Sequence, residues 1–239
     1  MNHKMESLTT MNRSLAFYEL LIVLILMAIT SLIFWLSDLD IQLAALFYFP
    51  DNHDDVWPIK QWPIVKVMFD YAFEFLVTLG VIAMMIFIAG FFTRYCRTWR
   101  YKSLYIVLLI ALGPGLVVNL IVKDHWGRPR PVHIKEFGGQ YDYIPPAKIG
   151  STPDKSFVCG HCSVGYAFFA LYFLAQNHKL FYFLLTLTFA WTMGFTRMAA
   201  GGHFLSDILW SGYLVFLVAY GLYYGWYKRI SKIVINQNP

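Results

Sequence analysis

The chain has 239 residues, of which 58% are hydrophobic and only 14% are charged, whereas soluble domains average about 45–50% and about 25%. So apolar a chain cannot cover its surface with polar groups, which excludes a water-soluble globular protein. The high apolar content excludes a disordered protein, and a total of 26 Gly and Pro residues with no fixed repeat excludes collagen-like and coiled-coil proteins. Three cysteines are too few for a disulfide scaffold. The net charge of +5 would suit nucleic acid, but the positions of the charges favour a membrane, and we expect no nucleic-acid partner.

Six apolar segments are candidates to cross a bilayer as helices, which takes about 20 residues each. In chain order they are 20–36, 75–92, 103–122, 163–175, 180–193 and 204–227. The third contains Gly113-Pro114-Gly115, which predicts a kink, and the fourth and fifth need flanking residues or tilted neighbours to reach across. We therefore predict an all-α polytopic membrane protein, with residues 1–239 forming one domain.

The distribution of Lys and Arg predicts the orientation, because these residues are retained on the cytoplasmic side. The connection between the second and third segments has four basic residues and no acid, and the C-terminal tail has three. The loop 37–74 has seven acids and only two lysines. Both termini are therefore expected in the cytoplasm. The first segment is interpreted as a retained anchor, because its apolar run is longer than a signal-peptide core and no cleavage site follows.

Three polar clusters interrupt the apolar segments, all on the predicted outer side. They are 123–131, 157–161 and 196–207, and ionisable groups so close to hydrocarbon indicate function by default. Lys and Arg neutralise phosphate oxygens, and His supplies a nucleophile or a general acid. The clusters predict an oxyanion site for phosphoryl transfer. No acidic cluster with metal-binding spacing accompanies them, so we expect a metal-free mechanism without a cofactor.

The histidines of these clusters have neighbours that suit this chemistry. His203 and Asp207 are four residues apart and share one face if a helix has begun, so the carboxylate would hold one ring nitrogen protonated and free the other to attack. His161 would protonate the leaving oxygen. The turn at Gly160 opens a helix whose free N–H groups would meet an anion.

These segments resemble the three signatures of the type-2 phosphatidic acid phosphatase family. They read KDHWGRPRP (123–131), VCGH (158–161) and TRMAAGGHFLSD (196–207), and the resemblance covers about residues 100–225. The second signature is usually Pro-Ser-Gly-His, so Val158-Cys159 departs from it, and Thr196 replaces the usual Ser. Three signatures in order on one membrane side make the resemblance specific.

The resemblance implies a role for each matching residue. His203 would form a phosphohistidine, oriented by Asp207, and His161 would serve as acid and then as base. The implied phosphate-binding residues are Lys123, Arg130, Arg197, Gly160 and Cys159. Arg128 has no place in the signature, and we interpret it as a contact for a second substrate charge or for solvent.

The wider pattern is similar to bacterial lipid A phosphatases, which implies a lipid substrate in the bilayer and a site at the periplasmic side of the inner membrane. We favour the 1-phosphate of lipid A over the 4′-phosphate. The alternative substrates are undecaprenyl pyrophosphate, phosphatidylglycerophosphate and phosphatidate. Two other functions stay open: a membrane thiol oxidoreductase that uses Cys159 and Cys162, and a transporter with the same basic pocket. If the two cysteines are not a redox centre, they can form a local disulfide.

Overall fold

The computed structural model describes residues 2–231, with side chains from residue 14 onward. Every regular element in this range is a helix, apart from one isolated bridge between Ile134 and Tyr141. The long helical segments are α1 (Asn2–Leu36), α3 (Pro63–Phe92), α5 (Arg100–Ile110) continued by the π-helix η2 (Ala111–Lys123), α6 (Gly160–Tyr166) followed by α7 (Phe169–Leu174), α8 (Lys179–Ala199), and α9 (Leu205–Leu222) continued by η5 (Tyr223–Tyr227). The short elements are α2 (Leu39–Ala45), η1 (Pro58–Gln61), α4 (Arg94–Arg97), η3 (Pro131–His133) and η4 (Lys135–Phe137). The all-α prediction is confirmed.

Within the described residues, four helical stretches are long and apolar enough to cross a membrane: Ser14–Leu36, Pro63–Phe92, Arg100–Lys123 and Leu205–Ser231. They contain or largely coincide with four of the six predicted segments. The other two correspond to the shorter apolar stretch Gly160–Leu174 and to α8, so the number six stays a prediction. Helix α3 starts at Pro63, well before the predicted start, because Pro suits a first helical turn and the polar residues that follow lower hydropathy without ending a helix.

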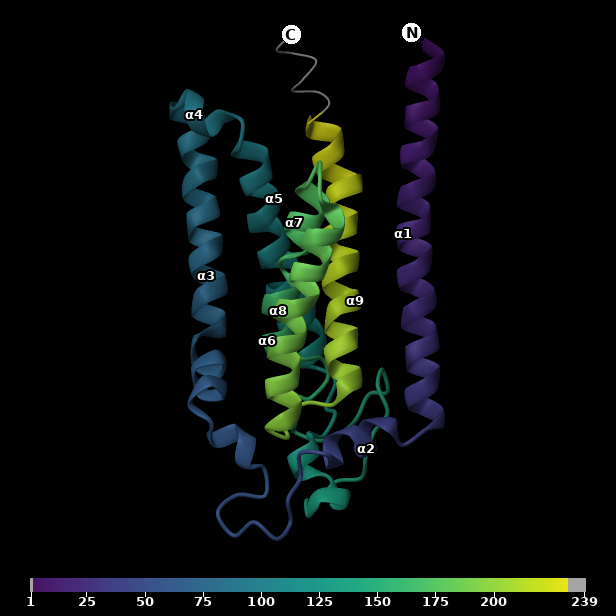
Figure 1. Ribbon diagram of the computed structural model, residues 1–239, viewed down its shortest axis with the longest axis vertical. Coiled ribbons are helices and arrows are strands. Elements are labelled where there is room, and N and C mark those ends of the chain that lie inside the picture. The colour runs from purple at the N-terminus through teal and green to yellow at the C-terminus, as the bar shows by residue number, and fades with distance from the viewer. Residues whose placement is uncertain (1, 232–239) are drawn as a thin grey trace.

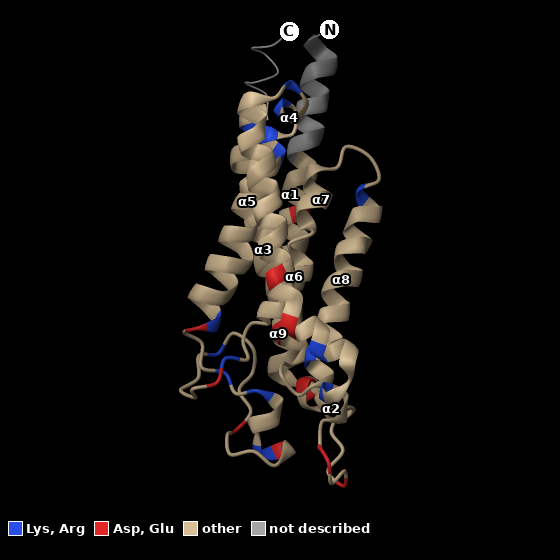
Figure 2. Ribbon diagram, turned by 90° about the vertical axis from the view of Figure 1, so that its left-hand side faces the viewer, with Lys and Arg blue, Asp and Glu red and all other residues tan. Residues whose placement is uncertain are grey.

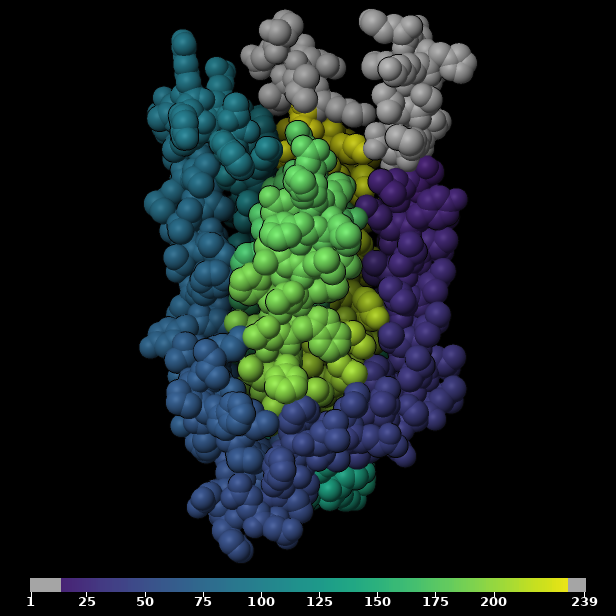
Figure 3. All heavy atoms as spheres, in the orientation of Figure 1, coloured from purple at the N-terminus to yellow at the C-terminus, as the bar shows by residue number. Residues whose placement is uncertain are grey.

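Apolar side chains cover the outside of the bundle. On α1, for example, Leu32 and Ile33 are 59% and 46% exposed, and a water-soluble protein would not leave such a continuous apolar face bare. Figure 3 shows the α6–α8 region between α3 and α1 on one face of the molecule. These outer faces are suited to lipid.

The helices pack closely where small residues lie at their crossings. A Cβ at Gly165 would lie 2.5 Å from the backbone of Ala190, so α6 and α8 approach almost backbone to backbone. A Cβ at Gly194 would lie 2.7 Å from Ile208 Cγ2, so the Ile208 side chain of α9 packs directly on the backbone of α8. Glu19, an acid within α1, accepts hydrogen bonds from Tyr172 (2.7 Å) and Tyr224 (2.9 Å).

The segment Gly113-Pro114-Gly115, for which a kink was predicted, lies within η2. Pro114 lacks the N–H of a helical hydrogen bond, and the helix widens to π geometry from Ala111 onward. The Asn119 side chain donates to the Pro114 carbonyl at 2.7 Å, which satisfies one backbone group in the widened turn. The widened helix ends at Lys123, at the end of the bundle where the polar clusters meet.

The two ends of the bundle differ in charge. Helix α4 and the end of η5 lie at one end, and α2, η3 and η4 lie at the other (Figure 1). Basic residues gather around α4 without acids, whereas the opposite end carries both signs of charge (Figure 2). The polar clusters predicted to hold the site all reach this mixed end.

Candidate functional site

The ends of four helices bring the three clusters together. Lys123 ends η2, Gly160 and His161 open α6, Arg197 lies in the last turn of α8, and His203 precedes α9. A Cβ at Gly160 would lie 2.4 Å from Asn119 Oδ1 and 3.0 Å from Lys123 Nζ. The first and second clusters therefore touch, and a larger residue at position 160 would displace the Asn119 and Lys123 side chains.

His203 is 1% exposed and has a defined partner at one ring nitrogen. Its Nδ1 lies 2.7 Å from the carbonyl oxygen of Ser156 and 3.6 Å from Oδ2 of Asp207. Because a carbonyl only accepts, Nδ1 carries the proton and Nε2 is left with a lone pair. The carbonyl of Ser156 therefore makes the hydrogen bond that the sequence assigned to Asp207, whose carboxylate is at ion-pair distance.

The pKa of His203 is lowered to about 4. Burial is the main cause, because it disfavours the charged imidazolium, and the charges of Arg197 and Lys123 act in the same direction. The Asp207 carboxylate opposes them. The ring is therefore neutral at pH 7, as a nitrogen nucleophile must be.

Asp207 is held by three donors. Its Oδ2 accepts from Ser156 Oγ at 2.6 Å and from the Phe204 N–H at 2.9 Å, and its Oδ1 accepts from Arg128 Nη1 at 2.5 Å. The bond to Phe204 caps the first turn of α9, where a negative charge is favourable. The same carboxylate thus fixes the start of α9 and lies beside His203.

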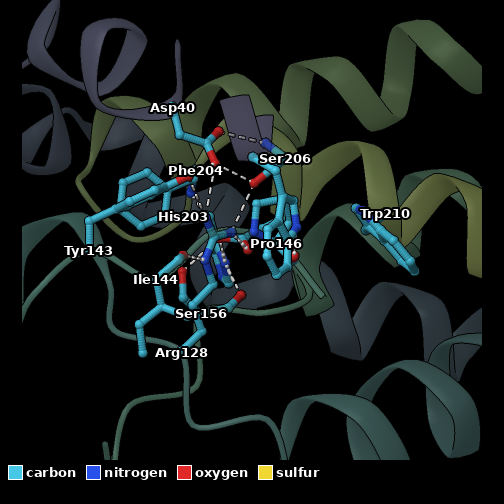
Figure 4. Close-up of polar contacts among 12 residues, drawn as sticks. Asp40, Arg128, Tyr143, Ile144, Pro146, Ser156, His203, Phe204, Ser206 and Trp210 are labelled. Atoms are coloured by element: carbon cyan, nitrogen blue, oxygen red, sulfur yellow. Dashed lines mark hydrogen bonds and ion pairs between the residues drawn. The ribbon is translucent and has the colours of Figure 1, made fainter. Parts of the chain in front are cut away.

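Arg128 is completely buried, so its interpretation as a contact for substrate or solvent is wrong. Its Nη2 donates to Asp40 Oδ2 at 2.9 Å, its Nη1 donates to Ser206 Oγ at 2.8 Å as well as to Asp207, and its Nε donates to the Ile144 carbonyl at 2.7 Å. Figure 4 shows this guanidinium among its partners. Burial alone would lower its pKa, but Asp207 and Asp40 outweigh burial and raise it.

Asp40 of α2 completes this network, and the sequence analysis did not identify it. It is buried, and it accepts from the Ser206 N–H (3.0 Å), the Ser206 hydroxyl (2.5 Å) and the Tyr143 hydroxyl (3.0 Å). Its position just after the first apolar segment is a weak signal. Ser156 and Ser206 were missed too, although Ser206 lies inside the third cluster.

The predicted phosphate-binding cations form a second group, and two of them, Arg197 and Lys123, act electrostatically on His203. Arg197 is 8% exposed, its guanidinium is 4.5 Å from the centre of the Phe69 ring, and its Nε has no hydrogen-bond partner in the described part of the chain. Lys123 interacts electrostatically with both Arg130 and Arg197. Three cations gathered in this way are suited to an anionic ligand.

A cavity of about 640 Å³ opens beside these cations. Arg130 and Arg197 line it together with residues of α3, η1 and the loop before α6. Gly202, also in its wall, leaves room for the arginine, because a Cβ there would lie 2.5 Å from Arg197 Nη2.

His161 lies against two aromatic rings of α3. Its imidazole stacks on Phe69 with the ring centres 4.7 Å apart and meets Phe73 edge-on at 4.9 Å. Its Nε2 is 3.2 Å from the Phe69 carbonyl, and its buried Nδ1 has no partner within residues 14–231. One nitrogen is thus tied to α3, and the other is unused.

The assignment of Cys159 as a phosphate ligand needs correction. Its sulfur is bonded to Cys162, and its backbone N–H donates to the carbonyl of Asp207 at 3.2 Å. Neither donor is left for a phosphate. Both cysteines are fully buried, whereas a redox centre needs an accessible thiol, so the structure does not favour the oxidoreductase.

Comparisons with known proteins identify the family of the chain. The family model described as the PAP2 superfamily matches residues 102–231. A lipid A 4′-phosphatase of Francisella tularensis subsp. novicida is 33% identical over 203 residues, 80% of this chain and 88% of its own length. A lipid A 1-phosphatase of Rhizobium etli is 32% identical over 120 residues, 50% of this chain and 45% of its own.

The fold has a solved counterpart. The crystal structure of a PAP2-type phosphatidylglycerolphosphate phosphatase from Bacillus subtilis aligns with a TM-score of 0.55 and 21% identity, covering 89% of this chain and 98% of that one. At this identity the likeness concerns the fold.

The matched region contains the signature residues from Lys123 to Asp207, and the helices that carry them belong to a bundle with membrane-spanning stretches, which defines a membrane-embedded phosphatase. The chain belongs to the PAP2 superfamily. It is a lipid phosphatase.

Proposed function

We propose that this phosphatase hydrolyses a phosphate monoester of lipid A, and that it removes the 4′-phosphate. The observation that carries the chemistry is the neutral, buried His203, on which the charges of Lys123 and Arg197 act, with Arg130 next to those two cations. The relative that matches 80% of the chain is named a lipid A 4′-phosphatase, whereas the 1-phosphatase matches half of it. These matches support the 4′-position over the 1-position that the sequence pattern favoured.

In the first step, the lone pair of His203 Nε2 attacks phosphorus, and the bond between phosphorus and the sugar oxygen breaks. Lys123, Arg130 and Arg197 neutralise the phosphoryl oxygens, on which charge accumulates in the transition state. His161 gives its proton to the leaving oxygen. A bound phosphate dianion favours the protonated imidazole that this step requires.

In the second step, His161 removes a proton from water, which attacks the phosphohistidine and releases inorganic phosphate. The P–N bond breaks, and His203 returns to its neutral form. The carbonyl of Ser156 keeps the proton on Nδ1 throughout, so that Nε2 is the nitrogen that reacts. No metal has a step in this scheme.

We place the protein in the bacterial inner membrane with both termini in the cytoplasm and the site at the periplasmic side. The support is the basic, acid-free segment 94–102 at the end of the bundle opposite to the site. Cysteine-accessibility labelling on intact cells tests this placement. Labelling of a Lys148→Cys variant, but not of native Cys96, by an impermeant reagent is expected.

The decisive experiment incubates the purified protein with lipid A bearing both phosphates and identifies the product by mass spectrometry. Loss of the 4′-phosphate, insensitive to chelators, is expected. Acid quenching should trap phosphorus on the wild-type chain and not on a His203→Ala variant. An unchanged lipid A, with phosphatidate or undecaprenyl pyrophosphate hydrolysed instead, would refute the substrate; loss of the 1-phosphate would refute the position.

A further inference from the structure

The cavity beside Arg130 and Arg197 extends well beyond the space that one phosphate needs. Its volume of about 640 Å³ lies within the range of about 300–1,000 Å³ that encloses whole small-molecule ligands. Its far wall is formed by η1, the first turns of α3 and the loop 153–155. Part of the substrate other than the reacting phosphate therefore has room to bind there.

This wall carries an excess of positive charge. Besides the two arginines, three lysines line the cavity, against two carboxylates; the charged lining residues are Lys60, Lys66, Lys155, Arg130, Arg197, Asp70 and Asp154, with His133 beside them. Asp154 is already used, since it binds His133 (2.7 Å) and the Arg130 N–H (3.0 Å). The cations that line the cavity thus outnumber its carboxylates.

Two of these lysines stand out in the sequence. The loop 37–74 contains seven acids and only two basic residues, Lys60 and Lys66, and both line the cavity. They precede residue 102, where the match to the PAP2 model begins. The superfamily signatures therefore do not account for them.

The lysines are available to an anion. The side chain of Lys66 has no ion-pair or hydrogen-bond partner among the described residues, and neither has the side chain of Asp70 one turn later. Lys60 pairs with Asp55 at 3.0 Å and Lys155 pairs with Asp124 at 2.7 Å, but these lysines are about half exposed. Such exposed pairs are weak and exchange readily for a bound phosphate.

We propose that this cavity is a second subsite, in which Lys60 and Lys66 bind the phosphate of lipid A that is not hydrolysed. This inference rests on the proposed function, because it requires a substrate with a sugar headgroup and two phosphates. Asp70 accepts hydrogen bonds from hydroxyl or amide groups of the sugar. The subsite makes the enzyme prefer a bisphosphorylated disaccharide to a phospholipid with one small phosphate head.

The test compares two substrates in detergent micelles: lipid A with both phosphates, and lipid A with only the phosphate that is hydrolysed. Wild-type protein is expected to show a lower KM for the first. A Lys60→Gln/Lys66→Gln variant should raise this KM by about tenfold and leave kcat, and both constants for the second substrate, within about twofold. Lys148→Gln, which removes an exposed lysine outside the cavity, is the matched control and should change neither.

Activity on the singly phosphorylated substrate reports folding of the variant, and Lys60→Arg/Lys66→Arg should restore the low KM. Equal KM values of the wild type for both substrates, or an equal rise for both in the variant, would overturn the subsite while leaving the proposed function intact. A wild type that hydrolyses neither lipid A but does hydrolyse phosphatidate would overturn the proposed function and the subsite with it.

Discussion

The charged residues near His203 form two groups that are built differently. In the first group, which we call the back, Arg128 lies between Asp40 and Asp207. Each of these three side chains is buried and hydrogen-bonded. In the second group, which we call the front, Arg130 and Arg197 border an open cavity. The Nε of Arg197 lacks a hydrogen-bond partner in the described chain. The charges of the back have protein partners before substrate binds, whereas the cations of the front are fully balanced only when an anion is bound.

This difference separates positioning from binding. A buried ion pair contributes little net stability but fixes geometry, because a displaced charge would lose its partner in a dry environment. The incompletely paired cations of the front lower the free energy of unfolding, and a bound phosphate raises it again. Substitutions behind His203 should therefore affect stability first, and substitutions in front of it should affect activity alone.

The largest effect on activity is expected for a substitution of His203 itself. Replacing His203 by Ala removes the nucleophile, and phosphate release should fall by about 10⁴-fold or more. The back network retains its ion pairs, so the thermal midpoint of the purified variant should change by only a few degrees. Residual activity within tenfold of the wild type would show that another group attacks phosphorus.

At the front, Arg197→Gln should lower kcat/KM by about 10²–10³-fold, as expected when one charged donor to the transition state is lost. The thermal midpoint should stay the same or rise, because a buried and incompletely paired charge is removed. Phosphate-release kinetics and a thermal melt check both. A large drop in stability would mean that this arginine holds the fold, and the contrast with the back would fail.

At the back, Arg128→Met leaves Asp40 and Asp207 as uncompensated buried charges and should lower the free energy of unfolding by about 3–5 kcal/mol. Thermal melts in detergent measure the loss. An Asp40→Asn change added to Arg128→Met removes one stranded charge and should recover part of it. If Arg128→Met alone were as stable as the wild type, the back would not hold the fold as proposed.

The front was largely predictable from sequence, and the back was not. Lys123, Arg130, Arg197, His161 and His203 are found in motifs with fixed spacing, and the fold brings their segments to one end. Asp40 is 88 residues from Arg128, and their contact depends on how α2 packs under α9. Hydropathy and motif spacing carry no information about such a long-range pairing, so Arg128 was misread.

The smallest effect is expected for the disulfide, which lies at the turn that opens α6. A Cys159→Ser/Cys162→Ser variant keeps the bond from the residue 159 N–H to the Asp207 carbonyl, which is a backbone interaction. The serine hydroxyl can accept from the residue 162 N–H as the sulfur does now, and the bridge closes only a short loop, so little chain entropy is released. Activity should therefore remain within a few-fold of the wild type, with a modest decrease in thermal midpoint. Loss of turnover in this variant, with the fold intact, would mean that the sulfur chemistry belongs to the mechanism, because neither side of His203 would have been altered.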